Sequence, residues 1–344
     1  MSGGPIGYYV HHHGEGHRQR ACAIVAEAPG RFTLIGTGVQ NLSGPFETLE
    51  LPDDRPVDRD SFDGVDGEFA RPDALHYAPI HHDGVRERTR IVASWIAERR
   101  PALMVVDVSV EIAMLSRLCA TPTIYVRLAG ARWDAAHLDA FRGAQALLAP
   151  FDPRCEDDGV PDWVRAKTFY ASGLGSFSPA PERSGDVILV AFGRGGSRTT
   201  GRNLEDAARA TPERQWRVIG PIDGPMPASA NLDVAGWVDH AGDEIVSAGI
   251  VVGGAGDGVL GAVAAGGKPY VCIPEDRPFG EQTAKARALN AAGAAVVLNS
   301  WPSPARWPEV LQKASALGSR AIAGFHDRHG PAKAVANILD WADR

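Results

Sequence analysis

The sequence has few cysteines, no excess of positive charge and no apolar run suited to a membrane. Its four cysteines stand far apart without metal-ligand spacing, and Cys22, Cys119 and Cys272 lie in apolar runs, which is typical of small buried hydrophobic side chains. Nothing in this pattern requires an oxidising compartment. A formal net charge of −7 excludes the broad basic surface that nucleic-acid binding uses. Phosphate binding would therefore be local, built from backbone amides and a few arginines.

The longest apolar run, residues 250–273, contains Asp257, Lys268 and many glycines, so it predicts no transmembrane helix. The N-terminus lacks a charged segment followed by a long apolar one, and we expect no secretory signal. These features favour a cytoplasmic protein without an integral membrane segment. A peripheral position at a membrane surface stays open, and the sequence does not fix the oligomeric state.

Short Val/Ile/Leu-rich runs alternate with helical patterns along most of the 344 residues. Continuous apolar strands separated by helices indicate parallel sheets covered on both faces, and the length suits two such domains. We expect strands over residues 7–10, 31–35, 48–51, 102–106, 123–126, 186–192, 216–219, 232–234, 249–252, 269–273 and 294–298. The sequence thus predicts an α/β protein with two doubly wound, Rossmann-like domains facing across a cleft.

Prolines, glycines and serines interrupt the alternation before residue 186 and divide the chain. We place an N-terminal domain at residues 1–172, a linker at 173–185, a C-terminal domain at 186–328 and a last helix at 329–344, which could pack back on the first domain. The Pro/Asp-rich loop 52–83 is long enough to be functional, and we expect it to shape a binding pocket.

Glycine turns follow strands of the second half at Gly193–Arg198 and Gly253–Gly256. In open parallel sheets, ligands bind at the carboxyl ends of the strands, and glycine lets backbone N–H groups approach a phosphate closely. Glu281 and Gln282 follow a third strand and are suited to sugar hydroxyls. The alternative is that these glycines only allow a helix to pack closely on the sheet.

A further glycine turn, Gly14–His17, ends the first strand and places a histidine at the start of a helix. Histidine is suited to general-base catalysis because its ordinary pKa lies near working pH. Asp107 ends a neighbouring strand on the same rim and could orient His17, with Glu111 in reserve and Arg127 placed to orient an anionic acceptor. As alternatives, His17 is bonded to backbone and Asp107 is a helix N-cap.

Several of these motifs stand together as they do in one group of enzymes: Gly14, Glu15, Gly16 and His17; Gly236-Trp-Val238; Gly253, Gly254, Gly256 and Asp257; Glu281 and Gln282. The chain resembles the two-domain GT-B glycosyltransferases that include MurG and the UDP-glucuronosyl-type and antibiotic glycosyltransferases. The resemblance implies an inverting hexosyltransferase with a UDP- or dTDP-sugar donor, an unidentified acceptor, and neither a metal nor another cofactor. The resemblance also implies a role for each motif. Gly14, Glu15 and Gly16 would bind the acceptor, and the backbone near Val238 would bind the nucleobase of the donor. The diphosphate would be bound by Gly193, Gly196, Arg198 and Gly254 to Asp257, and the sugar by Glu281 and Gln282.

The chain departs from this group at three places. The histidine or serine common near the second glycine turn is absent, the glutamate that grips the ribose falls on Ala262, and Asp257 adds a negative charge beside the phosphates. A nucleotide-sugar epimerase and a binding protein without turnover therefore stay as alternatives. Consecutive strand residues alternate faces, so we expect no metal site at His11 to His13. Lipid, polyketide, peptide and saccharide acceptors all remain open.

Overall fold

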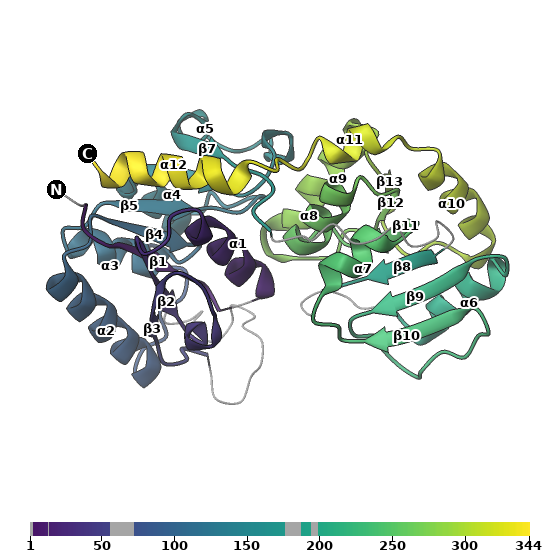
Figure 1. The fold of residues 1–344 in the computed structure, drawn as a ribbon, viewed down its shortest axis with the longest axis horizontal. Helices are drawn as coiled ribbons and strands as arrows, with labels where there is room; N and C mark the ends of the chain where they lie inside the picture. The colour runs from purple at the N-terminus through teal and green to yellow at the C-terminus, as the bar shows by residue number, and fades with distance from the viewer. Residues whose placement is uncertain (1–2, 13, 56–71, 176–186, 194–198) are drawn as a thin grey trace.

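The computed structural model describes residues 3–12, 14–55, 72–175, 187–193 and 199–344. His13, Gly196 and Arg198 lie outside these residues, as does half of the loop 52–83. Two parallel sheets stand side by side, each covered by helices, and the chain passes from one to the other once before its last helix returns to the first (Figure 1). The predicted α/β class is confirmed.

The N-terminal domain is built on a seven-stranded parallel sheet in the order β3-β2-β1-β4-β5-β6-β7. Its strands are β1 Ile6–Tyr9, β2 Phe32–Gly36, β3 Glu47–Glu50, β4 Leu103–Asp107, β5 Thr123–Val126, β6 Ala146–Ala149 and β7 Thr168–Tyr170. The first five match the predicted runs within two residues. Strands β6 and β7 were not predicted, because an Ala-Leu-Leu-Ala run favours a helix and a three-residue edge strand carries little periodicity.

Helices cover both faces of this sheet and separate two cores. They are α1 Glu15–Ala26, α2 Asp83–Arg99, α3 Val110–Leu118, α4 Ala135–Gly143, α5 Asp162–Lys167 and α12 Gly330–Ala342. On one face, Ile24 of α1 and Ile338 of α12 pack with Tyr8. On the other face, Trp95 and Phe141 pack beside strand residues such as Val106. The last helix therefore completes the core of the first domain.

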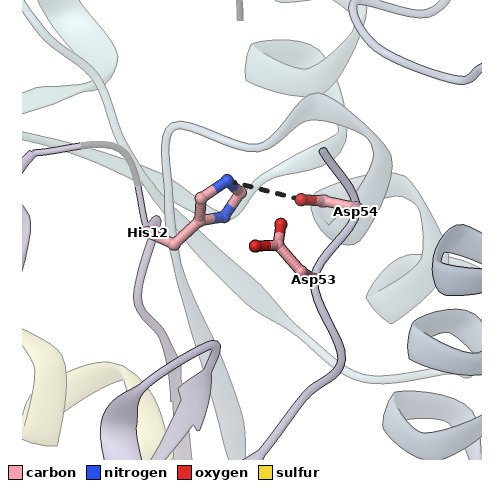
Figure 2. A group of neighbouring side chains, drawn as sticks. All are labelled: His12, Asp53 and Asp54. Carbon is pink, nitrogen blue, oxygen red and sulfur yellow. Dashed lines mark ion pairs between the residues drawn. The ribbon is translucent and has the colours of Figure 1, made fainter. Parts of the chain in front are cut away.

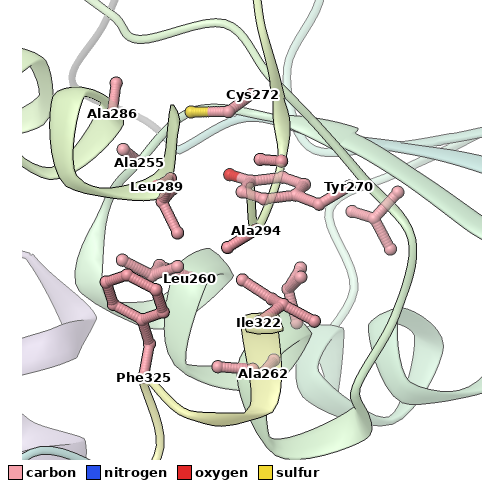
Figure 3. Close-up of a cluster of buried hydrophobic side chains, with 14 of the residues drawn as sticks. Ala255, Leu260, Ala262, Tyr270, Cys272, Ala286, Leu289, Ala294, Ile322 and Phe325 are labelled. Atoms are coloured by element: carbon pink, nitrogen blue, oxygen red, sulfur yellow. The ribbon is translucent and has the colours of Figure 1, made fainter. Parts of the chain in front are cut away.

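The C-terminal domain has a six-stranded parallel sheet in the order β10-β9-β8-β11-β12-β13. Its elements are β8 Val187–Ala191, α6 Gly201–Ala210, β9 Gln215–Ile219, β10 Leu232–Gly236, α7 Ala241–Ser247, β11 Ile250–Gly253, α8 Asp257–Gly266, β12 Tyr270–Cys272, α9 Glu281–Ala291, β13 Val296–Val297, α10 Trp307–Ser315 and α11 Ser319–Ala323. Alanines dominate one core, where Leu260 and Phe325 pack near Tyr270 and the buried thiol of Cys272 (Figure 3). Small side chains let α8 and α9 lie close to the strands.

Each sheet reverses its strand order at one place, and the predicted residues follow those places. The first sheet reverses between β1 and β4, and the second between β8 and β11. Ligands of open parallel sheets bind at such switch points, beyond the carboxyl ends of the strands. His17 follows β1 and Asp107 ends β4, whereas Gly193 follows β8 and Gly253 ends β11. Within the described part of the chain, every helix is too short or too polar to cross a bilayer.

Candidate active site

His17 and Asp107 meet at the switch point of the first sheet. Gly14, with a φ of 101°, lets the chain turn sharply into α1, and this turn places His17 in the first turn of the helix. His17 Nδ1 lies 3.1 Å from Asp107 Oδ2, and the Asp107 side chain is fully buried. Burial alone would raise the pKa of Asp107, but Arg20 and then His17 outweigh it and lower that pKa. An ionised carboxylate therefore faces the imidazole.

The alternative role for Asp107 as a helix N-cap is wrong. Helix α3 begins after Ser109, whose side chain accepts from the backbone N–H of Ile112 at 3.2 Å. This leaves the Asp107 carboxylate to His17 and Arg20.

Arg20 is a buried residue of this site that the sequence analysis missed. It lies one helical turn after His17 on α1, and Nη2 donates to both Asp107 oxygens at 3.0 Å. The same nitrogen is 2.8 Å from His17 Nδ1, and Nη1 donates across the domain boundary to Asp257 Oδ2 at 3.4 Å. The (i, i+3) spacing of His17 and Arg20 was the available signal, because side chains at that spacing share one helix face.

Arg20 belongs to a chain of charges that crosses between the domains twice. We call it the charge ladder; its members alternate in sign: Asp107, Arg20, Asp257, Lys285, Glu281 and Arg132. Lys285 contacts Asp257 and donates to Glu281 at 2.7 Å, and Arg132 of the first domain lies 3.4 Å from Glu281. Burial would lower the pKa of Lys285, but its two carboxylate partners raise it. With three anions and three cations, the ladder is neutral overall.

A hollow lies beside this ladder, between α1, α8 and the segment that joins the domains. Its cavity volume is about 60 Å³, and the open space at its mouth brings the empty volume to about 600 Å³. Arg20, Asp257 and Lys285 line one side, and Gly258 at the start of α8 lines another. Backbone N–H groups and the helix dipole make such a helix start favourable for an anion, and Gly256 provides no side-chain cap there.

The second glycine turn is less open than the sequence suggested. Gly253 and Gly254 are buried, and the Gln282 carboxamide oxygen accepts from the backbone N–H groups of Ala255 at 2.7 Å and Glu275 at 2.9 Å. Its amide nitrogen donates to the Glu275 carboxylate at 2.9 Å. Gln282 is 1% exposed and its carboxamide is engaged with protein partners, so its sugar-contact role stays a prediction that this structure does not support. The alternative interpretation, close packing, holds for the first two glycines, and only Gly256 and Asp257 stay partly exposed.

Other predicted donor residues occupy varied positions. Val238 is half-buried after β10 and packs against the alanine-rich core, and Gly193 follows β8 near the guanidinium of Arg277. Ala262, which stands where the resembled group carries its ribose-binding glutamate, is fully buried in that core, whereas its neighbour Gly261 lines the hollow. Ala262 packs in the alanine-rich core with Leu260 and Ile322 (Figure 3).

Two predicted acceptor residues turn out to be structural. Glu111 accepts from the backbone N–H groups of His76 at 2.6 Å and Tyr77 at 2.7 Å, so it anchors a loop. Arg127 is 2% exposed, pairs with Glu156, and stacks on Phe151. Neither side chain lines the hollow, so the two acceptor-binding roles stay predictions without structural support. The partners of a strand-end residue cannot be read from its position. Gly14 and Glu15 are exposed, and Gly16 lines the hollow.

His12 lies near two carboxylates at the exit of β1 (Figure 2). One potential ligand atom each from His12, Asp53 and Asp54 lie within 4.8 Å of one another. Arg55 pairs with Asp53, and Arg88 lies 3.2 Å from Asp54. These arginines already neutralise the two carboxylates, which removes the charge that would attract a cation.

The sequence alone matches no protein-family model and no curated protein. Solved structures are similar to it along almost their whole length. The glycosyltransferase of kitacinnamycin aligns with a TM-score of 0.72 at 14% identity, covering 99% of this chain and 100% of that one. The calicheamicin glycosyltransferase CalG4 aligns with a TM-score of 0.69 at 16% identity, and the alignment covers 100% of this chain and 99% of that one. MurG of Acinetobacter baumannii aligns with a TM-score of 0.64 at 14% identity, and the alignment covers 98% of this chain and 99% of that one.

The chain has the GT-B fold. At these identities the likeness establishes the architecture and leaves the reaction to the residues of the site. In that architecture the two switch points belong to different domains, so a ligand bound between them touches both. The charge ladder spans this boundary.

Proposed function

We propose that this protein is an inverting glycosyltransferase that moves a sugar from a nucleotide-diphosphate donor to an acceptor hydroxyl or amine. The observation that carries the proposal is the contact of His17 with the buried Asp107 at one switch point, opposite the start of α8 at the other. A base and an anion-favouring helix end thus come from different domains. A UDP- or dTDP-sugar is the donor we favour, and a plant glycosyltransferase of the same fold, 13% identical, is described in complex with UDP-2-fluoro-glucose and pterostilbene.

In this proposal His17 Nε2 takes the acceptor proton while the acceptor atom bonds to the anomeric carbon. The bond from that carbon to the diphosphate breaks, and its electron pair leaves with the diphosphate. Asp107 accepts from Nδ1–H, keeps the free lone pair on Nε2, and stabilises the imidazolium that forms. A positioned base of this kind contributes roughly 10² to 10⁴ in rate.

The leaving diphosphate needs positive potential, which the protein offers without a metal in our proposal. Gly258 in the first turn of α8 lines the hollow, and so do the buried cations Arg20 and Lys285. Such preorganised groups stabilise developing charge because they are already oriented before the reaction. Asp257 sits among them, so the donor must share these cations with that carboxylate.

A second function, nucleotide-sugar binding without turnover, is favoured by one observation. Gln282 fills the glycine turn, and Glu281 is held by Lys285 and Arg132. Both groups that would contact the sugar are thus engaged with protein partners. An epimerase would need acid/base groups free to act on the donor sugar, whereas Asp257 and Lys285 at the hollow are paired with each other and Asp152 is paired with Arg154.

The test is a transfer and hydrolysis assay with UDP-, dTDP- and GDP-sugars, together with donor binding measured by calorimetry. We expect His17→Ala to lose roughly 10² to 10⁴ in turnover while its donor affinity stays unchanged. His240→Ala, which alters an exposed histidine of the other domain, is the matched control. Equal turnover in the wild type and His17→Ala would remove His17 from the mechanism. Binding without turnover in every protein would establish the second function.

A further inference from the structure

Arg20 and His17 contact the same carboxylate, and Arg20 also contacts the His17 ring. Nη2 of Arg20 carries two hydrogens, yet three acceptors surround it: Asp107 Oδ1 and Oδ2 at 3.0 Å, and His17 Nδ1 at 2.8 Å. His17 Nδ1 also lies 3.1 Å from Asp107 Oδ2. If Nδ1 accepts from Arg20, the ring proton is on Nε2; if Nδ1–H donates to Asp107, Nε2 carries the lone pair. These two arrangements exclude each other.

Only one of the two arrangements is compatible with general-base catalysis. A base must present a lone pair toward the acceptor, and in His17 that atom is Nε2, since Nδ1 faces Asp107 and Arg20. The position of Arg20 therefore decides whether the imidazole can accept a proton.

Asp257 gives Arg20 a second anchor in the other domain. Nη1 reaches Asp257 Oδ2 at 3.4 Å, which is longer than either contact to Asp107. Arg20 Nε is buried and has no hydrogen-bond partner among the described residues, so the guanidinium is not fully satisfied where it lies. A stronger pull from Asp257 would draw Arg20 toward α8 and away from Nδ1.

We infer that Arg20 is a positioning residue: its contact with Asp257 determines which ring nitrogen of His17, Nδ1 or Nε2, carries the proton. When Asp257 holds Arg20, Asp107 accepts Nδ1–H and Nε2 is free to act as the base. When the domains part or Asp257 is lost, Arg20 donates to Nδ1 and the base is blocked. The catalytic consequence rests on the proposed function, whereas the position of the proton does not.

The experiment measures the protonation of His17 Nδ1 by two-bond ¹H–¹⁵N NMR of the full chain labelled with ¹⁵N-histidine. The His17 signal is the one missing in His17→Gln. We expect Nδ1 protonation to rise in Arg20→Gln, because Asp107 then has His17 as its remaining partner, and to fall in Asp257→Asn. Arg18→Gln, which removes a half-exposed arginine of the same helix, is the matched control and should leave the signal unchanged.

Opposite shifts in the two variants are required, since a merely structural role would move the signal in neither direction or in the same one. Equal Nδ1 protonation in wild type, Arg20→Gln and Asp257→Asn overturns the inference. If Arg20→Gln does not fold, Asp257→Asn decides alone: an unchanged or increased Nδ1 protonation overturns it.

The proposed function can fail separately from this inference. That would be so if no nucleotide-sugar is turned over while Nδ1 protonation is still higher in Arg20→Gln and lower in Asp257→Asn than in the wild type. Where transfer is measured, kcat should follow the fraction of His17 with a proton on Nδ1. A fall of that fraction from one half to one tenth lowers kcat about fivefold. Turnover that depends on His17 but not on Asp257 would leave the proposed function standing without this switch.

Discussion

The carbonyl oxygen of Phe279 accepts a hydrogen bond from the backbone N–H of Ala131 across the domain boundary, at 2.7 Å. Phe279 lies in η4, Pro278–Gly280, and has a φ of 65°, which is unusual for a side chain of this size. Its ring packs edge-on against His137 and under the guanidinium of Arg132. The strained residue of one domain is thus held by the loop of the other.

This junction leaves no space beside Gly130. A Cβ there would lie 2.4 Å from the Phe279 carbonyl oxygen, and Gly130 has a φ of 92°. We expect Gly130→Ala to lower the free energy of unfolding by about 3 kcal/mol and to separate the domains, because both the clash and the backbone strain act there. Thermal denaturation and the radius of gyration from X-ray scattering measure the two effects.

The matched control for Gly130 is Gly293→Ala. Gly293 also has a positive φ, 59°, but nothing lies within 4 Å of its Cβ position. We expect Gly293→Ala to lower the free energy of unfolding by about 1 kcal/mol because of backbone strain, and to leave the domain arrangement unchanged. Equal scattering curves for both variants would show that the junction does not hold the domains together.

Replacing Arg127 tests whether this residue stabilises the fold without taking part in turnover. Arg127→Met leaves the Glu156 carboxylate buried without its cation, so we expect a loss of about 3–5 kcal/mol in the free energy of unfolding. Turnover per folded molecule should not change, since Arg127 lies away from the hollow. Arg142→Met is the control, because its exposed pair with Asp139 is worth about 1 kcal/mol or less.

The Arg127 effect has a definite pH dependence. Burial would raise the pKa of Glu156, but Arg127 outweighs it and that pKa is lowered. The stabilisation from the pair is therefore present above the ordinary glutamate pKa and is lost as pH falls through the folded-state value. In Arg127→Met the Tyr170 hydroxyl still donates to Glu156, but no cation opposes the burial of its carboxylate. Acid should therefore narrow the difference in unfolding free energy between the wild type and Arg127→Met. A gap that widens on acidification would contradict this account.

Local patterns predicted most of the sheet and the ends of its strands. The strands ending near His17 and Asp107 were predicted because fully buried parallel strands are continuous apolar runs. Asp107 and Arg127 look alike in the sequence, since each follows a buried strand, yet one faces the switch point and the other pairs with Glu156. The difference lies in which distant segment folds against each residue.

The contacts between domains could not be predicted from a single sequence. Arg20 and Asp257 are 237 positions apart, and Arg132 and Glu281 are 149 apart. No periodicity links such positions, because each contact depends on how two finished domains dock. The charge ladder therefore emerges only in three dimensions.

Replacing Gln282 distinguishes a structural role of this residue from a sugar-binding role. Gln282→Ala removes the acceptor of two buried backbone N–H groups, at Ala255 and Glu275, and we expect a loss of about 2–4 kcal/mol in the free energy of unfolding. Gln312→Ala on the exposed face of α10 should stay within about 0.5 kcal/mol of the wild type. Chemical denaturation measures both. An unchanged stability together with a large rise in the KM for the donor would restore Gln282 as a ligand-binding residue.

His12 should make the stability of the protein fall in mild acid. Burial is the main cause that lowers the pKa of His12 to about 4, although Asp54 opposes it. Between the ordinary histidine pKa and about 4, the unfolded chain binds the proton that the folded chain refuses, so stability declines as pH falls through this range. His12→Gln cannot take up that proton, and its unfolding free energy should decline less over the same range. His240→Gln, an exposed histidine, is the matched control. Equal pH slopes for the wild type and His12→Gln would mean that the imidazole stays accessible to protons in the folded protein.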